Sequence, residues 1–273
     1  MDWKKQFAYL SLIIILILTA CSNTATAIST NVSAAETAAT TDPPVIPLTP
    51  TTSSTATSTT LCAHTYYPVR AGATWTYQST GSPADDFRFT DTITSPDNDG
   101  FTLTSKYEKF TRTQGWACTP EGLFALELGG PIVAALQSQS IQLDLELTNA
   151  GGITFPHDIA AGDTWQQTLE FAGDMTIAGE AGTASGTAQV NFSAIGIERV
   201  SVVAGEFDAM KIQADSLVDL NVTYEGLTVP VTYTATYTYW FAPDIGWVKA
   251  TGNVNLAELS FTENIELQSY NIP

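Results

Sequence analysis

The chain is poor in basic residues, histidine and cysteine. Its 273 residues include 10 Lys and Arg, 28 Asp and Glu, two His and three Cys, and its formal net charge is −18. Such a chain lacks the positive surface that binds nucleic acid, so we expect no nucleic-acid partner. The same negative charge opposes adhesion of the folded part to anionic lipid head groups.

Sequence signals for nucleophilic catalysis are also missing. There is no Gly-x-Ser-x-Gly elbow, and only His64 and His157 could serve as a base. A glycosidase needs two paired carboxylates, and the sequence singles out no such pair. We therefore expect no enzymatic activity and no cofactor, and a glycoside hydrolase or other hydrolase is the least favoured alternative.

The sequence contains few residues at the spacings that are typical of metal ligands. Two Cys and two distant His show no zinc pattern. The segment Asp97-Asn98-Asp99-Gly100 resembles the start of a calcium loop, and Glu108 occupies the twelfth position. Residues 101–107 alternate like a strand, however, so the sequence favours a hairpin turn and no metal site.

Aromatic residues are absent from Ser22–Thr60, where nearly half of the residues are Ser or Thr. Such a segment cannot bury enough apolar surface to offset the entropy of ordering it. We predict a solvated stalk over residues 21–60. Its Ser, Thr and Pro content is also compatible with O-glycosylation.

The N-terminus carries the strongest targeting signal. Lys4 and Lys5 precede an apolar run, Phe7–Leu18, and Cys21 follows Leu18-Thr19-Ala20. The pattern resembles the bacterial lipoprotein signal, in which residues 1–20 are removed and Cys21 receives acyl chains such as palmitate. The alternatives are a signal peptide cleaved elsewhere and an uncleaved anchor, although the run is shorter than the ~20 residues of a spanning helix.

This signal predicts an extracytoplasmic protein that is tethered by lipid to the cell membrane or the outer membrane. With Cys21 lipidated, Cys62 and Cys118 remain as a pair. In an exported protein we expect them to form a disulfide, which would fasten the end of the stalk to a strand near Trp116. Two unpaired thiols are the alternative.

Helical periodicity is nearly absent from residues 61–273, and alternation with a period of two replaces it. The clearest examples are residues 101–107, 141–147 and 231–239, with turn-forming residues between such runs. One short helix is expected at about Pro131–Gln139. The sequence predicts an all-β, mostly antiparallel domain with a strongly curved or barrel-like sheet and at most one or two short helices.

An internal echo suggests duplication of a β-unit. Tyr67–Trp75 and Phe155–Trp165 both read aromatic-Pro, a few residues, and then Ala-Gly-x-Thr-Trp. Gly permits the tight turn, and Trp opens a strand with a large side chain to bury. The halves would be 61–150 and 151–273. Coincidence in a chain rich in Thr and Gly is the alternative.

Three blocks carry a resemblance to a known family: Tyr66–Tyr77, Val203–Ile212 and Tyr239–Lys249. Together they resemble the TapB-like group of exported bacterial proteins of unknown function, over roughly residues 65–270. The resemblance implies a fold similar to lipoprotein carriers, in which a curved antiparallel sheet wraps an apolar face, and it implies no catalytic residues. Asp244 stands where Gly is expected in that pattern.

Aromatic side chains give the candidate binding residues. Tyr233, Tyr237 and Tyr239 share one face of an expected strand, and Trp240 follows directly. Such a row packs a β-core, lines an apolar cavity or stacks on sugars. The preferred function is non-catalytic binding of an apolar or envelope-derived ligand, or of an envelope protein, on the concave face. The alternative is a surface module that binds carbohydrate.

Overall fold

A computed structural model describes residues 61–273 except 83–84, 128–140, 178 and 257–258. These residues lie in one compact unit, Ala56–Pro273. The predicted signal segment, Cys21, the stalk and the helix expected at Pro131–Gln139 lie outside the described residues. Within the described part, no helix is long and apolar enough to cross a membrane.

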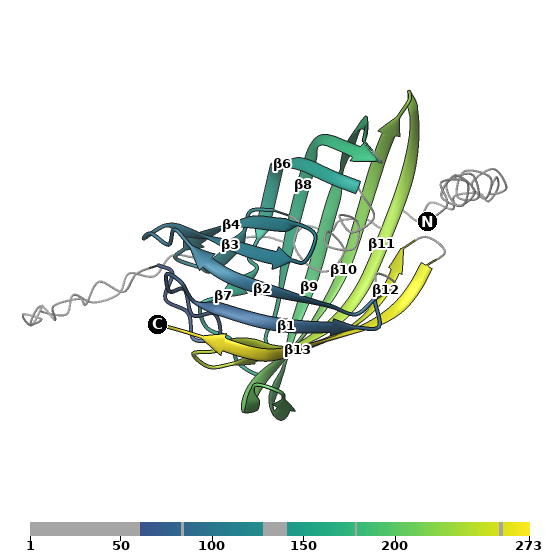
Figure 1. Ribbon diagram of the computed structural model, residues 1–273. Helices are drawn as coiled ribbons and strands as arrows, with labels where there is room; N and C mark the ends of the chain where they lie inside the picture. Colours follow the sequence, from purple (N-terminus) through teal and green to yellow (C-terminus); the bar gives the residue numbers. More distant parts are fainter. Residues whose placement is uncertain (1–60, 83–84, 128–140, 178, 257–258) are drawn as a thin grey trace, which may run out of the picture. The chain divides into compact units, whose positions relative to one another are not determined.

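Thirteen strands form one curled sheet (Figure 1). They are β1 (Thr74–Thr80), β2 (Phe87–Thr94), β3 (Gly100–Tyr107), β4 (Thr111–Thr119), β5 (Gly122–Ala125), β6 (Ile141–Gly152), β7 (Phe155–Pro156), β8 (Thr164–Ile177), β9 (Glu180–Val202), β10 (Gly205–Tyr224), β11 (Leu227–Ala242), β12 (Gly246–Leu256) and β13 (Leu259–Asn271). Every neighbouring pair is antiparallel. The predicted all-β fold and its strong curvature are confirmed.

The strand order shows that both parts of the chain share this sheet. The order is β6-β8-β9-β10-β11-β12-β13-β1-β2-β3-β4-β5-β7. The C-terminal β13 pairs with the N-terminal β1, so the sheet runs without a break between them. In addition, β6 pairs with β8, and β7 pairs with β5. Residues 61–150 and 151–273 are therefore interleaved in one sheet.

Alternation along a strand separates the two faces of the sheet. On β11, Tyr233 and Tyr237 are buried, whereas Thr234 and Thr236 are exposed. Successive side chains of a strand point to opposite faces, so odd or even position decides which face a residue joins. Strand β11 thus presents tyrosines to the concave face and threonines to the convex face.

Hydrogen bonds join the two arms of the curled sheet near β5 and β8. The Nε2 of Gln167 on β8 donates to the carbonyl of Ala125 on β5 at 3.1 Å. The N–H of Ala125 donates to the Oγ1 of Thr154 at 2.8 Å. Gln167 is 5% exposed, so its amide hydrogen bond is shielded from water. Because β5 and β8 lie far apart in the strand order, these contacts stabilise the curl.

The two copies of the Ala-Gly-x-Thr-Trp pattern adopt the same turn. Gly72 has a φ of 77° and donates to the carbonyl of Ile93 at 3.0 Å, and Gly162 has a φ of 96° and donates to the carbonyl of Ala194 at 2.7 Å. Positive φ at both positions is the reason for glycine. Two further backbone bonds close each turn: Ala73 to Arg70 and Ile93 to Ala73 in the first copy, Asp163 to Ala160 and Ala194 to Asp163 in the second. The echo in the sequence therefore corresponds to a repeated local structure.

A disulfide joins Cys62 and Cys118, which are 56 positions apart in the chain. It fastens the segment before β1 to strand β4. In the chain-entropy treatment, closing a loop of this length stabilises the folded state by about 4 kcal/mol.

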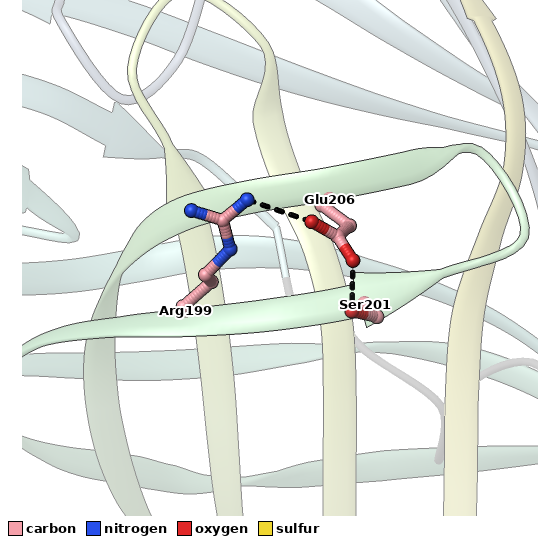
Figure 2. A network of polar contacts seen from close by, with 3 residues as sticks. All are labelled: Arg199, Ser201 and Glu206. Atoms are coloured by element: carbon pink, nitrogen blue, oxygen red, sulfur yellow. Dashed lines mark hydrogen bonds and ion pairs between the residues drawn. The ribbon is translucent and has the colours of Figure 1, made fainter.

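The β9–β10 hairpin carries a polar network (Figure 2). Arg199 Nη2 lies 2.7 Å from Glu206 Oε2, and Ser201 Oγ donates to Glu206 Oε1 at 3.4 Å. The hydrogen bond from Arg199 lowers the pKa of Glu206. The side chains of Arg199 and Glu206 are 68% and 59% exposed, so water screens the pair and it contributes little to stability.

Candidate ligand-binding cavity

The concave face encloses an open hollow of about 280 Å³. Its lining comes mainly from strands β2 to β5 and β7 to β13, and most of the lining is apolar. Small-molecule sites typically measure ~300–1,000 Å³. The hollow lies just below the lower end of this range, a size that suits one small molecule or one acyl chain and is too small for a folded domain.

One side of the hollow is a run of contacting aromatic rings, which we call the aromatic wall: Tyr237, Tyr239, Trp247, Phe89 and Tyr107. Successive ring centroids lie 5.6, 6.2, 6.3 and 5.2 Å apart. Aromatic pairs at such distances contribute about 0.5–1.5 kcal/mol each beyond the area they bury. Mutual contacts, edge-on between Tyr239 and Trp247 and stacked in the other pairs, therefore hold these rings in place.

A second part of the lining, which we call the aliphatic wall and which adjoins the aromatic wall where β10 pairs with β11, is made by Leu169, Ala188, Val190, Ala214 and Val218 of strands β8, β9 and β10. Ala188 and Ala214 are buried and project only a methyl group. Protein interiors normally fill such space to crystal-like density. Short side chains on these central strands are thus the local reason why the concave face is hollow.

A buried carboxyl group lies at the aromatic wall. Glu263 on β13 is 1% exposed, and it accepts hydrogen bonds from Tyr237 Oη at 2.8 Å and from Ser79 Oγ at 2.6 Å. Burial raises the pKa of Glu263, and the two hydrogen bonds act in the opposite direction. The Tyr237 ring reaches Glu263 across Gly252 on β12, where a Cβ would overlap the ring. Glycine is required here for close approach.

A second buried carboxyl group, Asp91 on β2, also lines the hollow and is 5% exposed. Burial raises the pKa of Asp91 to about 6, while a hydrogen bond from Ser105 and the charge of Arg112 act in the opposite direction. Its Oδ1 has no hydrogen-bond partner among the described residues. Trp116 Nε1 is the other polar atom of the lining that lacks a partner among the described residues, and such unpaired buried atoms are costly.

The structure brings together three of the four aromatic residues that the sequence proposed for binding. Tyr233, Tyr237 and Tyr239 all line the hollow. Trp240 lies outside that lining, with the Nζ atoms of Lys211 and Lys249 at 5.4 and 5.9 Å from its ring centroid. Its even position on β11 explains this placement, because the three tyrosines occupy odd positions.

Sequence reasoning missed the two buried carboxyl groups. Asp91 lies two residues from both Phe89 and Ile93, and Glu263 lies two residues from Ile265. Each acidic residue thus shares a strand face with buried apolar neighbours. The sequence signal that could have predicted them is an acidic residue at a position where the alternation of the strand calls for an apolar one.

The two histidines, considered above as bases, lie side by side, with ring centroids 6.4 Å apart. His64 Nδ1 accepts from the N–H of Tyr66 at 3.1 Å, and His64 Nε2 donates to the carbonyl of Pro156 at 2.7 Å. His157 Nε2 donates to the carbonyl of Thr119 at 3.0 Å. Burial lowers the pKa of His64. Neither histidine lines the hollow, and both fasten backbone segments.

The segment considered as a calcium loop connects β2 to β3. Asp97 Oδ1 accepts from the N–H groups of Asp99 and Gly100 at 2.9 and 2.7 Å, so this carboxylate stabilises the turn. Across the described residues, no group of three or more His, Cys, Asp or Glu side chains is placed to hold a metal ion.

The fold and the hollow define a class of protein: a curled antiparallel half-barrel with an apolar concave face. The chain belongs to the DUF3108-like family, whose model matches residues 109–255, more than half of the sequence. The family model that matches is the DUF3108-like one, so the TapB-like resemblance stays a prediction.

Three solved structures are similar to the chain at low identity. A predicted exported protein from Bacteroides fragilis with a YmcC-like fold is 10% identical, with a TM-score of 0.44 over 77% of this chain and 100% of that one. A predicted lipoprotein from Parabacteroides distasonis is 10% identical, with a TM-score of 0.42 over 77% and 99%. The hypothetical lipoprotein YmcC from Escherichia coli is 9% identical, with a TM-score of 0.32 over 74% and 85%. No curated protein matches the sequence significantly.

Proposed function

We propose that this chain is a non-catalytic binding protein of the cell envelope, and that its hollow holds the apolar body of a small amphiphilic ligand. The observation that carries the proposal is the open hollow of about 280 Å³ with its mostly apolar lining. A ligand that covers such a lining gains roughly 25 cal/mol for each Å² of apolar surface removed from water.

The position of the tyrosines favours an enclosed ligand over a surface glycan. A carbohydrate platform displays the faces of its aromatic rings to solvent, whereas Tyr233 and Tyr237 are 4% and 3% exposed. Both side chains line the hollow instead. The volume of the hollow likewise favours a small molecule or a single acyl chain over an envelope protein.

The chemistry of the lining supports holding a ligand without reacting with it. The lining is chiefly aromatic and aliphatic. Glu263 is engaged by Ser79 and Tyr237, and His64 uses both ring nitrogens in contacts with the backbone. We therefore assign the hollow no catalytic step.

The proposal is tested by filling the hollow. Ala188 is 4% exposed and lines the hollow, whereas the neighbouring Thr187 is exposed on the other face of β9. Titration with the neutral fluorescent hydrocarbon diphenylhexatriene should show saturable binding. Ala188→Phe should weaken that binding by about tenfold or more, because the phenyl ring takes up the space of the ligand.

Thr187→Phe is the matched control, since it adds the same ring one residue away on the convex face. It should leave the affinity within about twofold of the original. The proposal fails if the unmodified protein does not bind the hydrocarbon, or if the two variants bind it equally well.

The envelope location rests on the sequence pattern Leu18-Thr19-Ala20-Cys21. A lipid on Cys21 would tether the domain through the stalk of residues 21–60. Metabolic labelling with a fatty acid should mark the unmodified protein and leave Cys21→Ser unlabelled. Equal labelling of both forms would refute the anchor.

A further inference from the structure

The hollow contains a polar group that the apolar-binding proposal does not use. The Oδ1 of Asp91 has no hydrogen-bond partner among the described residues, although the residue is only 5% exposed. Its carboxyl group accepts a hydrogen bond from Ser105. Buried carboxylates normally have partners for both oxygens. One acceptor therefore remains available beside the hollow.

The charges around this acceptor disfavour an anion. Among the described residues that line the hollow, Arg112 is the only cationic side chain, whereas Asp91, Glu127 and Glu263 are acidic. Arg112 already interacts electrostatically with both Asp91 and Glu127. A ligand carboxylate would add a further negative charge to this group, while an ammonium would offset one.

We propose that Asp91 binds the hydrogen-bond-donating head group of the ligand, with a primary ammonium preferred, while the apolar body of the ligand fills the hollow. This inference rests on the proposed function and specifies its ligand class: an alkyl or aromatic amine. An ammonium would donate to Oδ1 and neutralise a carboxylate that burial otherwise disfavours.

The aromatic wall supports the same choice. Tyr107 and Phe89 of the aromatic wall lie on β3 and β2, the strands that carry Ser105 and Asp91. Aromatic faces attract cations, by about 0.5–2 kcal/mol depending on solvent exposure. A head group at Asp91 would thus lie beside both a carboxylate and aromatic rings.

A competing account places only water at Asp91. Asp91 also borders a separate space of about 10 Å³, together with Tyr67, Trp75 and Trp247. That volume is near the minimum for a single water molecule. If Oδ1 faces only this space, Asp91 would have no influence on the choice of ligand.

The experiment measures displacement of diphenylhexatriene by dodecylamine, dodecan-1-ol and dodecanoate at pH 7.5, each below its micelle concentration. These competitors share one chain and differ in the head group. The unmodified protein should prefer dodecylamine to dodecanoate by about tenfold or more, the size of a charged hydrogen bond. Dodecan-1-ol should fall between the two.

Asp91→Asn should reduce this preference to about threefold or less. Asp219→Asn is the matched control, because Asp219 is exposed and accepts a hydrogen bond from Thr232 outside the lining of the hollow. It changes the net charge equally and should keep the full preference.

If Asp91→Asn does not fold, the unmodified protein still gives a test. The preference for dodecylamine over dodecan-1-ol, which does not titrate, should decline as the pH falls from 7.5 to 5, since Asp91 becomes protonated while the alkylammonium stays charged. Tyr67, Tyr77, Tyr107 and Arg112 interact with Asp91 and do not titrate in this range. Glu127 and Glu263 also line the hollow, and burial raises the pKa of Glu263, so Glu263→Gln is measured in parallel and should show the same decline.

Two results would overturn the inference and leave the proposed function intact: equal displacement by all three competitors, or an unchanged preference in Asp91→Asn. Failure of the protein to bind diphenylhexatriene would refute the proposed function, and the inference would fall with it.

Discussion

The aromatic wall and the aliphatic wall face the same hollow but are built in different ways. The rings of the aromatic wall contact one another, and Tyr237 is further held by Glu263. The aliphatic wall includes Ala188 and Ala214, whose short side chains leave space in front of β9 and β10. One wall is therefore fixed by its own contacts, and the other provides the room. A binding site needs both, because a ligand requires a rigid surface and an unfilled volume.

The largest effect should come from removing the ring that supports the aromatic wall. Tyr77 is 1% exposed, stacks on Trp247 at 3.8 Å and on Phe89 at 5.1 Å, and donates from Oη to the carbonyl of Trp247 at 2.9 Å. Tyr77→Ala should lower the free energy of unfolding by about 3–5 kcal/mol in urea titrations. Tyr77→Phe keeps the ring and should cost only about 0.5–1.5 kcal/mol. Equal losses in the two variants would contradict the stacking account.

The next effect concerns pH. Burial raises the pKa of Asp91 to about 6. The folded state therefore keeps a proton on Asp91 at pH values where the unfolded chain has lost it, so the contribution of Asp91 to stability is fully present below about pH 4 and is lost as the pH rises through about 6. The change amounts to about 3 kcal/mol. The raised pKa of Glu263 acts with the same sign.

Urea unfolding at pH 4.5 and pH 7.5 measures this effect as a difference between two proteins. The loss of stability between these values should be clearly smaller in Asp91→Asn than in the unmodified protein. Subtraction removes the repulsion among the many surface carboxylates, which acts in the same direction. An identical pH dependence in both proteins would show that Asp91 titrates normally.

A smaller effect is expected from crowding the aromatic wall. Gly252→Ala places a methyl group where the Tyr237 ring lies, so the ring must shift and its hydrogen bond to Glu263 weakens. We expect a loss of about 1–3 kcal/mol, as for other overpacked cores. Thr251→Ala, at the residue that precedes Gly252 on β12, is the control and should change the free energy of unfolding by no more than about 0.5 kcal/mol. If Gly252→Ala leaves the free energy of unfolding unchanged, the Tyr237 ring can move aside without loss, and the close approach across Gly252 is not required.

Strand alternation allowed much of the fold to be predicted from the sequence. The threonine and tyrosine positions of residues 231–239 predicted both the strand and the shared face of Tyr233, Tyr237 and Tyr239. The repeated Ala-Gly-x-Thr-Trp pattern likewise predicted two equivalent turns. These features are local, because they depend on residues that are neighbours in the chain.

The parts that sequence reasoning missed depend on contacts between distant residues. Glu263 meets Ser79, 184 positions away, and the bond from Gln167 to Ala125 joins β8 to β5. Nothing in the local pattern around these residues identifies the partner. Gly252 is similar, since its lack of a side chain matters only because Tyr237 lies across it. Curvature could be predicted, but the contacts that set the hollow could not.

The central claim is that a ligand lies in the hollow against both walls, and photo-crosslinking tests it most directly. A dodecyl diazirine should be irradiated with the protein, and the labelled peptides mapped by mass spectrometry. The account predicts labels on both the aromatic and the aliphatic wall, and suppression of those labels by excess dodecylamine. Labels confined to the exposed apolar side chains of Ile197, Val203 and Leu227, which are 59%, 71% and 71% exposed, would contradict it.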